Sequence, residues 1–201
     1  MPFAHPPSDP WPVVEQWLAE AGAHPEVRYA HAACLSTVAE DGGGDGRVVL
    51  AERHPSRRAF VVLTDVESPK AVQLRAQPRA ALTFYWPALE RQLRLRGTFH
   101  RAEDALASQL FEQRPRQSRA TAWASRQSQP LVADDPLDRR LSEMDRRLAE
   151  VEPIPRPDRW HALEIDVETL EFWQAGARRL HQRLRYLHLG QDQWRFESLE
   201  P

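Results

Sequence analysis

The chain has 201 residues and a formal net charge of −2, and it lacks the basic field that binding to nucleic acid or an anionic membrane would require. Cys34 is the only cysteine, so an internal disulfide and a cysteine-based metal centre are excluded, and no metal site is expected. Because the sequence has neither a membrane-length apolar segment nor a secretory leader, we expect one cytoplasmic domain over residues 1–201.

The first helix is predicted directly after residues 1–10, which we expect to form a flexible arm. Asp9 is a good helix cap and Pro10 suits a first helical position. Apolar residues then recur at helical spacing, namely Trp11, Val14, Trp17 and Leu18.

From residue 30 onward the sequence changes to short β-like segments separated by turns such as the glycine-rich stretch 40–46. We expect strands at residues 34–38, 47–51, 60–63, 80–86, 93–99, 163–167, 170–173, 184–188 and 194–197. Further helices are expected from Ser68, over 103–113 and over 138–151. This pattern predicts a mainly β fold with peripheral helices (α+β), built as an antiparallel barrel.

Lys70 is unusual because it is the only lysine among 27 basic residues, the others all being arginine. It follows Ser68 and Pro69, which favour the start of a helix. A helix N-terminus with a serine hydroxyl and a compact ammonium beside it is a natural seat for a phosphate group. The alternative is an ordinary capped helix on the surface.

Two further segments carry clustered polar side chains. Arg179, His181 and Arg183 alternate as they would on one face of a strand, where they could bind an anion and polarise a ring substrate. Residues 114–128 are rich in hydrogen-bond donors and lack periodicity, so we expect an irregular, ligand-facing segment. A solvated basic face and a flexible surface loop are the respective alternatives.

These segments together resemble the pyridoxamine 5'-phosphate oxidase family over roughly residues 9–201. The resemblance rests on the sequences DPWPVVEQWLAEA, RVVL, SPKAVQL, LERQLRLRG, RPRQSRATAWASRQSQPL, EFWQ and RLHQRLRY. It implies an FMN-binding split β-barrel that forms a homodimer with FMN at the subunit interface. Residues 160–201 would then be C-terminal strands that complete the flavin and substrate site.

The resemblance also implies roles for individual residues. Arg179 and His181 match catalytic residues that hold the substrate over the flavin, and Arg114 and Ser118 match part of a clamp for the substrate phosphate. With Ser68 added from the helix-start argument, the residues expected to bind FMN are Arg47, Thr64, Ser68, Lys70, Gln92, Gln127, Ser128, Trp173 and Arg183. Pro69 stands where the family has an arginine.

The substrate clamp departs from the family pattern at two positions. Glu52 replaces a lysine and Leu110 replaces a tyrosine, so a carboxylate and an isobutyl group stand where a phosphate would need donors. The resemblance implies an oxidase that transfers hydride from a small heterocyclic substrate to the flavin N5, with O2 as acceptor and H2O2 as product. Pyridoxine or pyridoxamine 5'-phosphate is the first expected substrate. The alternatives are a phenazine-biosynthesis-type oxidase of a reduced non-phosphorylated heterocycle and a non-catalytic flavin- or vitamer-binding protein.

Overall fold

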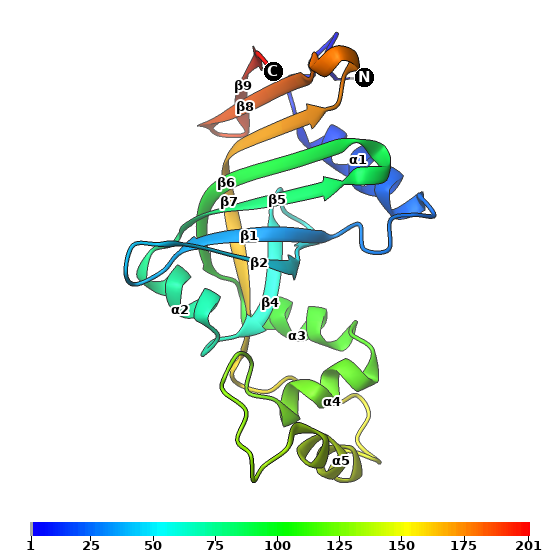
Figure 1. Cartoon of the computed structure of the whole chain (residues 1–201), viewed down its shortest axis with the longest axis vertical. Helices are drawn as coiled ribbons and strands as arrows, with labels where there is room; N and C mark the ends of the chain where they lie inside the picture. Colours follow the sequence, from blue (N-terminus) through cyan, green and yellow to red (C-terminus); the bar gives the residue numbers. More distant parts are fainter. Residues whose placement is uncertain (1) are drawn as a thin grey trace.

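A computed structural model describes residues 2–201, and Figure 1 shows a strongly curled sheet with helices at its periphery. Helix α1 spans Trp11–Ala23 and begins as predicted, because the Asp9 carboxylate accepts a hydrogen bond from the Trp11 backbone N–H at 3.1 Å. Two residues of the segment expected to form a flexible arm contact the rest of the chain. The Phe3 ring packs 6.3 Å from the Trp17 ring, and the Pro7 carbonyl accepts a 2.9 Å hydrogen bond from the Tyr186 hydroxyl. Residues 2–10 therefore lie against the core.

The described residues form one nine-stranded sheet in the order β2-β1-β5-β6-β7-β4-β3, with β8 pairing to β7 and β9 to β8. Every strand pair within it is antiparallel, which confirms the mainly β fold. The strands are β1 (Ala32–Val38), β2 (Gly44–Leu50), β3 (Glu52–Arg53), β4 (Phe60–Asp65), β5 (Arg79–Trp86), β6 (Arg91–Arg101), β7 (Trp160–Gln174), β8 (Gln182–Gly190) and β9 (Gln193–Leu199).

Strand β7 joins two segments that were predicted as separate strands, 163–167 and 170–173. The sequence pattern breaks there because the register with β6 shifts between Arg96 and Gly97, where β7 carries one extra residue. A Cβ on Gly97 would lie 1.9 Å from the Asp166 carbonyl, so only glycine allows β6 and β7 to approach this closely. With this bulge, β7 continues as one strand over Trp160–Gln174.

The remaining helices are α2 (Pro69–Ala76), α3 (Asp104–Glu112), α4 (Arg116–Ala124) and α5 (Leu137–Arg147). Helix α4 corrects the expectation of an irregular segment over 114–128. Its buried side chains are mostly alanines, which make a helical face without the large apolar residues that reveal periodicity. A short 3-10 turn at Ala177–Arg179 also differs from expectation. Strand β8 begins only at Gln182, so Arg179 and His181 lie in a loop and only Arg183 lies on the strand.

The main core lies between α1 and the concave side of the sheet. Trp17 sits at its centre, with its ring 5.0 Å from Phe172 of β7 and 6.5 Å from Trp86 of β5. Inward residues of β6 such as Leu93 and Leu95 are fully buried, while their neighbours in sequence point outward. The outward face therefore carries the polar side chains of these strands.

Candidate functional site

A cluster of polar side chains lies at the start of helix α2, and we call it the lysine cluster: the buried Thr64, Ser68 and Lys70 and the half-buried Gln127. The Gln127 side-chain carbonyl accepts hydrogen bonds from the Lys70 ammonium at 3.0 Å and the Thr64 hydroxyl at 2.8 Å. The Ser68 hydroxyl lies 3.1 Å from that of Thr64 and donates to the Asp65 carbonyl at 2.7 Å. The cluster ties β4 and α2 to the segment after α4, so the structure brings together four of the residues expected to bind FMN.

Lys70 is the charged member of this cluster and is only 8% exposed. Burial, together with the nearby positive charge of Arg47, lowers the pKa of Lys70 to about 8. Among the described residues its hydrogen-bond acceptor is the neutral Gln127 amide, so the ammonium is buried without a paired carboxylate. A buried cation of this kind is suited to an anionic ligand.

Arg47 and Ser128 flank the lysine cluster. Arg47 lies on β2, where its guanidinium donates to the Leu35 carbonyl at 3.1 Å and the Thr37 hydroxyl at 2.5 Å. Ser128 follows Gln127 and is exposed, with a φ of 65°, a left-handed conformation that residues other than glycine seldom adopt. Such constrained backbone often accompanies a binding site.

A second group of expected flavin contacts forms a row across three strands, which we call the tryptophan row: Gln92, Trp173 and Arg183. Gln92 of β6 pairs with Trp173 of β7, which pairs with Arg183 of β8, so their side chains share the outward face. Arg183 is held by Glu171, whose carboxylate accepts from its Nε at 3.1 Å and its Nη2 at 2.9 Å. Glu171 is 7% exposed and the Arg183 side chain 27% exposed, so this pairing is partly buried.

The loop between β7 and β8 carries Arg179 and His181 next to the tryptophan row. The His181 ring lies 4.8 Å from the Trp173 ring and is tilted 41° to it, and the His181 Nδ1 accepts from the Gly176 backbone N–H at 3.4 Å. A neutral His181 therefore carries its proton on Nε2, where it can donate to a ligand. Arg179 is exposed and has a φ of 64°. Although the predicted strand is absent here, the loop still places His181 beside Trp173.

The residues expected to clamp a substrate phosphate lie at the α3–α4 end of the molecule. The Arg114 guanidinium lies 4.6 Å over the Trp160 ring, and burial lowers the pKa of this arginine. It pairs with no carboxylate among residues 2–201. Ser118 is half-buried near the start of α4, while Leu110 of α3 packs against the apolar cluster that contains Val61. This subsite offers one unpaired cation and an apolar wall.

Glu52 pairs in register with Val61 of β4, which belongs to the same apolar cluster as Leu110. Its side chain is half-exposed and lies 3.4 Å from the Nδ1 atom of His31. No arginine or lysine forms an ion pair with Glu52 among the described residues. The carboxylate therefore gives this edge of the subsite a negative charge.

The lysine cluster and the tryptophan row lie at opposite ends of β7. Thr64 pairs with His161 at the start of β7, and Trp173 is twelve residues further along the strand. At the usual rise per residue this corresponds to roughly 40 Å of strand. Figure 1 shows α2 in the lower half of the molecule and β8 and β9 at the top. One flavin cannot touch both groups within a single chain.

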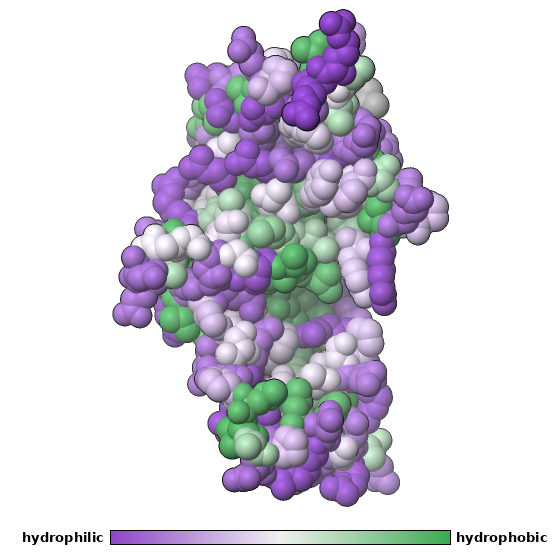
Figure 2. All heavy atoms as spheres, viewed as in Figure 1, coloured by the Kyte–Doolittle hydropathy of each residue, from purple (hydrophilic) through white to green (hydrophobic). Residues whose placement is uncertain are grey.

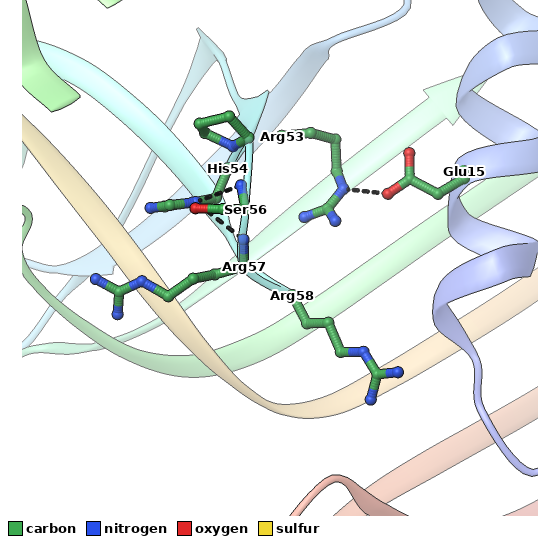
Figure 3. A pocket seen from close by; sticks show the side chains of 7 residues that line it. Glu15, Arg53, His54, Ser56, Arg57 and Arg58 are labelled. Atoms are coloured by element: carbon green, nitrogen blue, oxygen red, sulfur yellow. Dashed lines mark hydrogen bonds and ion pairs between the residues drawn. The ribbon is translucent and has the colours of Figure 1, made fainter. Parts of the chain in front are cut away.

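A surface pocket near α1 contains three arginines, each of which is already paired with a carboxylate. Figure 3 shows this pocket of about 410 Å³ beside the loop after β3. The ion pairs join Arg53 to Glu15 at 2.7 Å, Arg58 to Asp9 at 2.7 Å and Arg57 to Glu164 at 3.4 Å. These ion pairs hold the loop after β3 against β7 and the start of α1.

Among residues 2–201, no group of His, Cys, Asp or Glu is placed to hold a metal ion. No helix in the described range is long and apolar enough to cross a membrane.

Comparison with known proteins gives two family matches. Residues 21–174 match the pyridoxamine 5'-phosphate oxidase model, and residues 160–201 match the C-terminal dimerisation region of pyridoxine 5'-phosphate oxidase. A pyridoxine/pyridoxamine 5'-phosphate oxidase from Rubrobacter xylanophilus is 39% identical over 96% of this chain and 88% of its own length. One from Anaeromyxobacter dehalogenans is 43% identical over 86% of this chain and 85% of its own.

Solved structures agree with these matches. The crystal structure of PhzG from Burkholderia lata 383 in complex with tetrahydrophenazine-1-carboxylic acid has a TM-score of 0.89 and 30% identity, covering 100% of this chain and 96% of that one. A related FMN-binding protein from Nostoc punctiforme shares the fold, with a TM-score of 0.78 and 18% identity over 96% of this chain and 98% of its own. The curled antiparallel sheet is therefore that of the FMN-binding split barrels.

The chain belongs to the pyridoxamine 5'-phosphate oxidase family. It is an FMN-dependent oxidoreductase of that family, and FMN is its cofactor. The lysine cluster fits the phosphate end of this cofactor, because it offers a buried ammonium that has no carboxylate partner. The tryptophan row offers a flat aromatic surface and a partly buried guanidinium, which suit the ring system.

Some neighbours of these residues were not predicted from the sequence. Gln73 and Asp45 both contact Arg47, and Glu171 orients Arg183. Gly176 shapes the loop that holds His181, since a Cβ there would lie 2.0 Å from the Leu180 carbonyl. For Glu171 the sequence does carry a signal. It lies two residues before Trp173 on the predicted strand, so the two side chains are expected on the same face.

Proposed function

We propose that this chain is an FMN-dependent oxidase of a small heterocyclic substrate, with pyridoxine or pyridoxamine 5'-phosphate as the first candidate. Bound FMN would supply a hydride acceptor at N5 and pass the electrons on to O2, which gives H2O2. The buried, unpaired ammonium of Lys70 is the observation that carries the proposal, because it needs an anion such as the flavin phosphate. Arg47, Ser128 and the rest of the lysine cluster complete this end of the cofactor site.

The cofactor site is completed in a homodimer. Because the lysine cluster and the tryptophan row are too far apart along β7 for one flavin, each flavin lies between the lysine cluster of one protomer and the tryptophan row of its partner. Exposed apolar side chains support an interface, since Val48 and Leu50 on the outer side of β2 are 72% and 53% exposed. Figure 2 shows apolar groups in a hollow on one face and at the α4–α5 end, surrounded by polar atoms.

The loop residues act on the substrate rather than on the cofactor. Arg179 binds an electron-rich edge of the substrate, and His181 donates its Nε2 proton to a polar atom of the substrate ring. The contact between the His181 and Trp173 rings supports this role, because it puts the donor next to the tryptophan row. Arg114, with Ser118, binds an anionic group at the other end of the substrate.

The clamp favours a second candidate substrate class, a reduced non-phosphorylated heterocycle. One unpaired guanidinium matches a monoanion such as a carboxylate better than a phosphate dianion, and Glu52 repels the second charge. Leu110 offers apolar surface where a hydroxyl donor would serve a phosphate. The similarity to the PhzG complex is consistent with this alternative.

The test is the colour and chemistry of the purified protein. We expect a yellow protein that releases FMN, not FAD, on denaturation and bleaches anaerobically when its substrate is added. A colourless protein that fails to take up FMN contradicts the proposal. Binding of pyridoxine 5'-phosphate and of reduced phenazine carboxylates without bleaching would instead indicate a non-catalytic flavin- or vitamer-binding protein. Comparing kcat/KM for the two substrate classes decides between the two oxidase candidates.

A further inference from the structure

The Arg47 guanidinium has most of its hydrogen-bond capacity engaged by the protein. Its Nη1 donates to the Leu35 carbonyl and the Thr37 hydroxyl, and its Nη2 donates to the Gln73 side-chain carbonyl at 3.0 Å and pairs with the Asp45 carboxylate. A guanidinium has five N–H donors, and these partners use the four on Nη1 and Nη2. A ligand anion that reaches Arg47 therefore meets an arginine whose charge already has a counter-ion.

Asp45 is held in this position from two directions. It lies two residues before Arg47 on β2, so both side chains share one face of the strand. Gln73 of α2 bridges them, since its Nε2 donates to the Asp45 carboxylate at 2.8 Å while its Oε1 accepts from Arg47. The Gln73 hydrogen bond lowers the pKa of the Asp45 carboxyl, so Asp45 is charged at neutral pH. The carboxylate is fixed beside Arg47 rather than free in solvent.

Arg47 also faces the lysine cluster. It contacts Gln73, which lies three residues after Lys70 on α2, and its positive charge contributes to the lowered pKa of Lys70, so the two cations repel each other. Lys70 has only the neutral Gln127 amide as its acceptor among the described residues. An anion placed between Arg47 and Lys70 would relieve their repulsion. The Asp45 carboxylate, however, already forms an ion pair with Arg47.

We propose that Asp45 is a built-in competitor for the cofactor phosphate, which limits FMN affinity by pairing with Arg47 in the flavin-free protein. This inference rests on the proposed function, because it takes the lysine cluster as the phosphate site. The phosphate must share Arg47 with Asp45 or displace it, and Gln73 keeps the carboxylate close enough to return when the cofactor leaves. Asp45 thus sets how readily the chain exchanges its flavin.

The experiment compares Asp45→Asn with the unmodified protein after both have been stripped of flavin. Asparagine keeps the size and the hydrogen-bond acceptor for Gln73 but removes the charge. We expect FMN to bind about two- to fivefold more tightly, the range for a partly exposed ion pair, and the gain to shrink as salt is raised. Riboflavin lacks the phosphate, so its affinity should not change. The melting temperature of the flavin-free variant should not rise, because an ion pair has been lost.

Asp41→Asn is the matched control, because Asp41 lies on the same hairpin and contacts only the Gly43 backbone N–H. It should leave FMN affinity unchanged. FMN affinity that is equal or weaker in Asp45→Asn, or a gain shared equally by riboflavin, overturns the inference while the proposed function stands. If the unmodified protein binds neither FMN nor riboflavin, the proposed function fails instead, so the two failures are distinguishable.

Discussion

Replacing Lys70 with methionine should make the flavin-free protein more stable. The pKa of Lys70 is lowered from 10.5 to about 8 by burial, so the unfolded chain binds its proton more tightly than the folded chain does. The free energy of unfolding should therefore rise with pH between about 8 and 10.5, and at pH 7 the buried charge costs about 3 kcal/mol. Losing the hydrogen bond to Gln127 costs about 1 kcal/mol, which leaves a net gain of about 2 kcal/mol for Lys70→Met.

The same change should weaken FMN binding. A hydrogen bond to a charged group contributes about 1.5–3 kcal/mol, so the dissociation constant for FMN should rise by about ten- to a hundredfold. In the unmodified protein, FMN affinity should also fall as the pH rises above about 8, where free Lys70 loses its proton. That part of the pH dependence should vanish in Lys70→Met.

Two measurements check this reasoning: urea unfolding of the flavin-free proteins at pH 7 and pH 10, and FMN titration across the same range. Arg75→Met is the control, because Arg75 is exposed on the same helix and its side chain contacts only the Val66 carbonyl. An unchanged FMN affinity in Lys70→Met would show that the lone lysine is not a phosphate ligand. A less stable variant at pH 7 would refute the assigned cost of the buried charge.

Three further predictions concern the substrate and the dimer. Glu52→Lys combined with Leu110→Tyr should raise kcat/KM for pyridoxine 5'-phosphate by about tenfold or more, while a non-phosphorylated substrate gains nothing; a micromolar KM in the unmodified protein would contradict the divergent clamp. Gly176→Ala should raise the substrate KM with little change in FMN affinity, because its Cβ would collide with the Leu180 carbonyl; Gly22→Ala, whose Cβ would meet only the Ala30 Cβ at an ordinary contact distance of 3.9 Å, should leave both unchanged. Removing FMN should loosen the dimer in sedimentation, and a monomer that binds FMN tightly would exclude the shared site.

The strands could be predicted from the sequence because alternating apolar residues reflect one buried face of a sheet. Helix α4 could not, because its packing depends on small alanines such as Ala120 and Ala122 rather than on a periodic apolar stripe. The loop before β8 was also beyond prediction. The backbone of Arg178 and Arg179 is left-handed, which propensities for these residues do not indicate.

The candidate site shows the same division. Lys70 could be singled out because composition alone marked it as an exception, and its burial supports that choice. Its surroundings could not, since Asp45 and Gln73 are 28 residues apart and meet only when α2 packs against the β1–β2 hairpin. A hydrogen bond between distant segments, such as that from Gln73 to Asp45, leaves no periodic signal in the sequence.

In the proposed homodimer, the placement of the lysine cluster and the tryptophan row at opposite ends of β7 has a genetic consequence. A chain defective only at Lys70 and a chain defective only at Trp173 would each be inactive as a homodimer, yet a mixed dimer would contain one site with both residues intact. Alleles of these two kinds should complement each other within one gene. A chain defective at both positions would instead inactivate both sites of every mixed dimer that it forms with an unmodified chain. Such an allele would therefore be dominant over the unmodified copy.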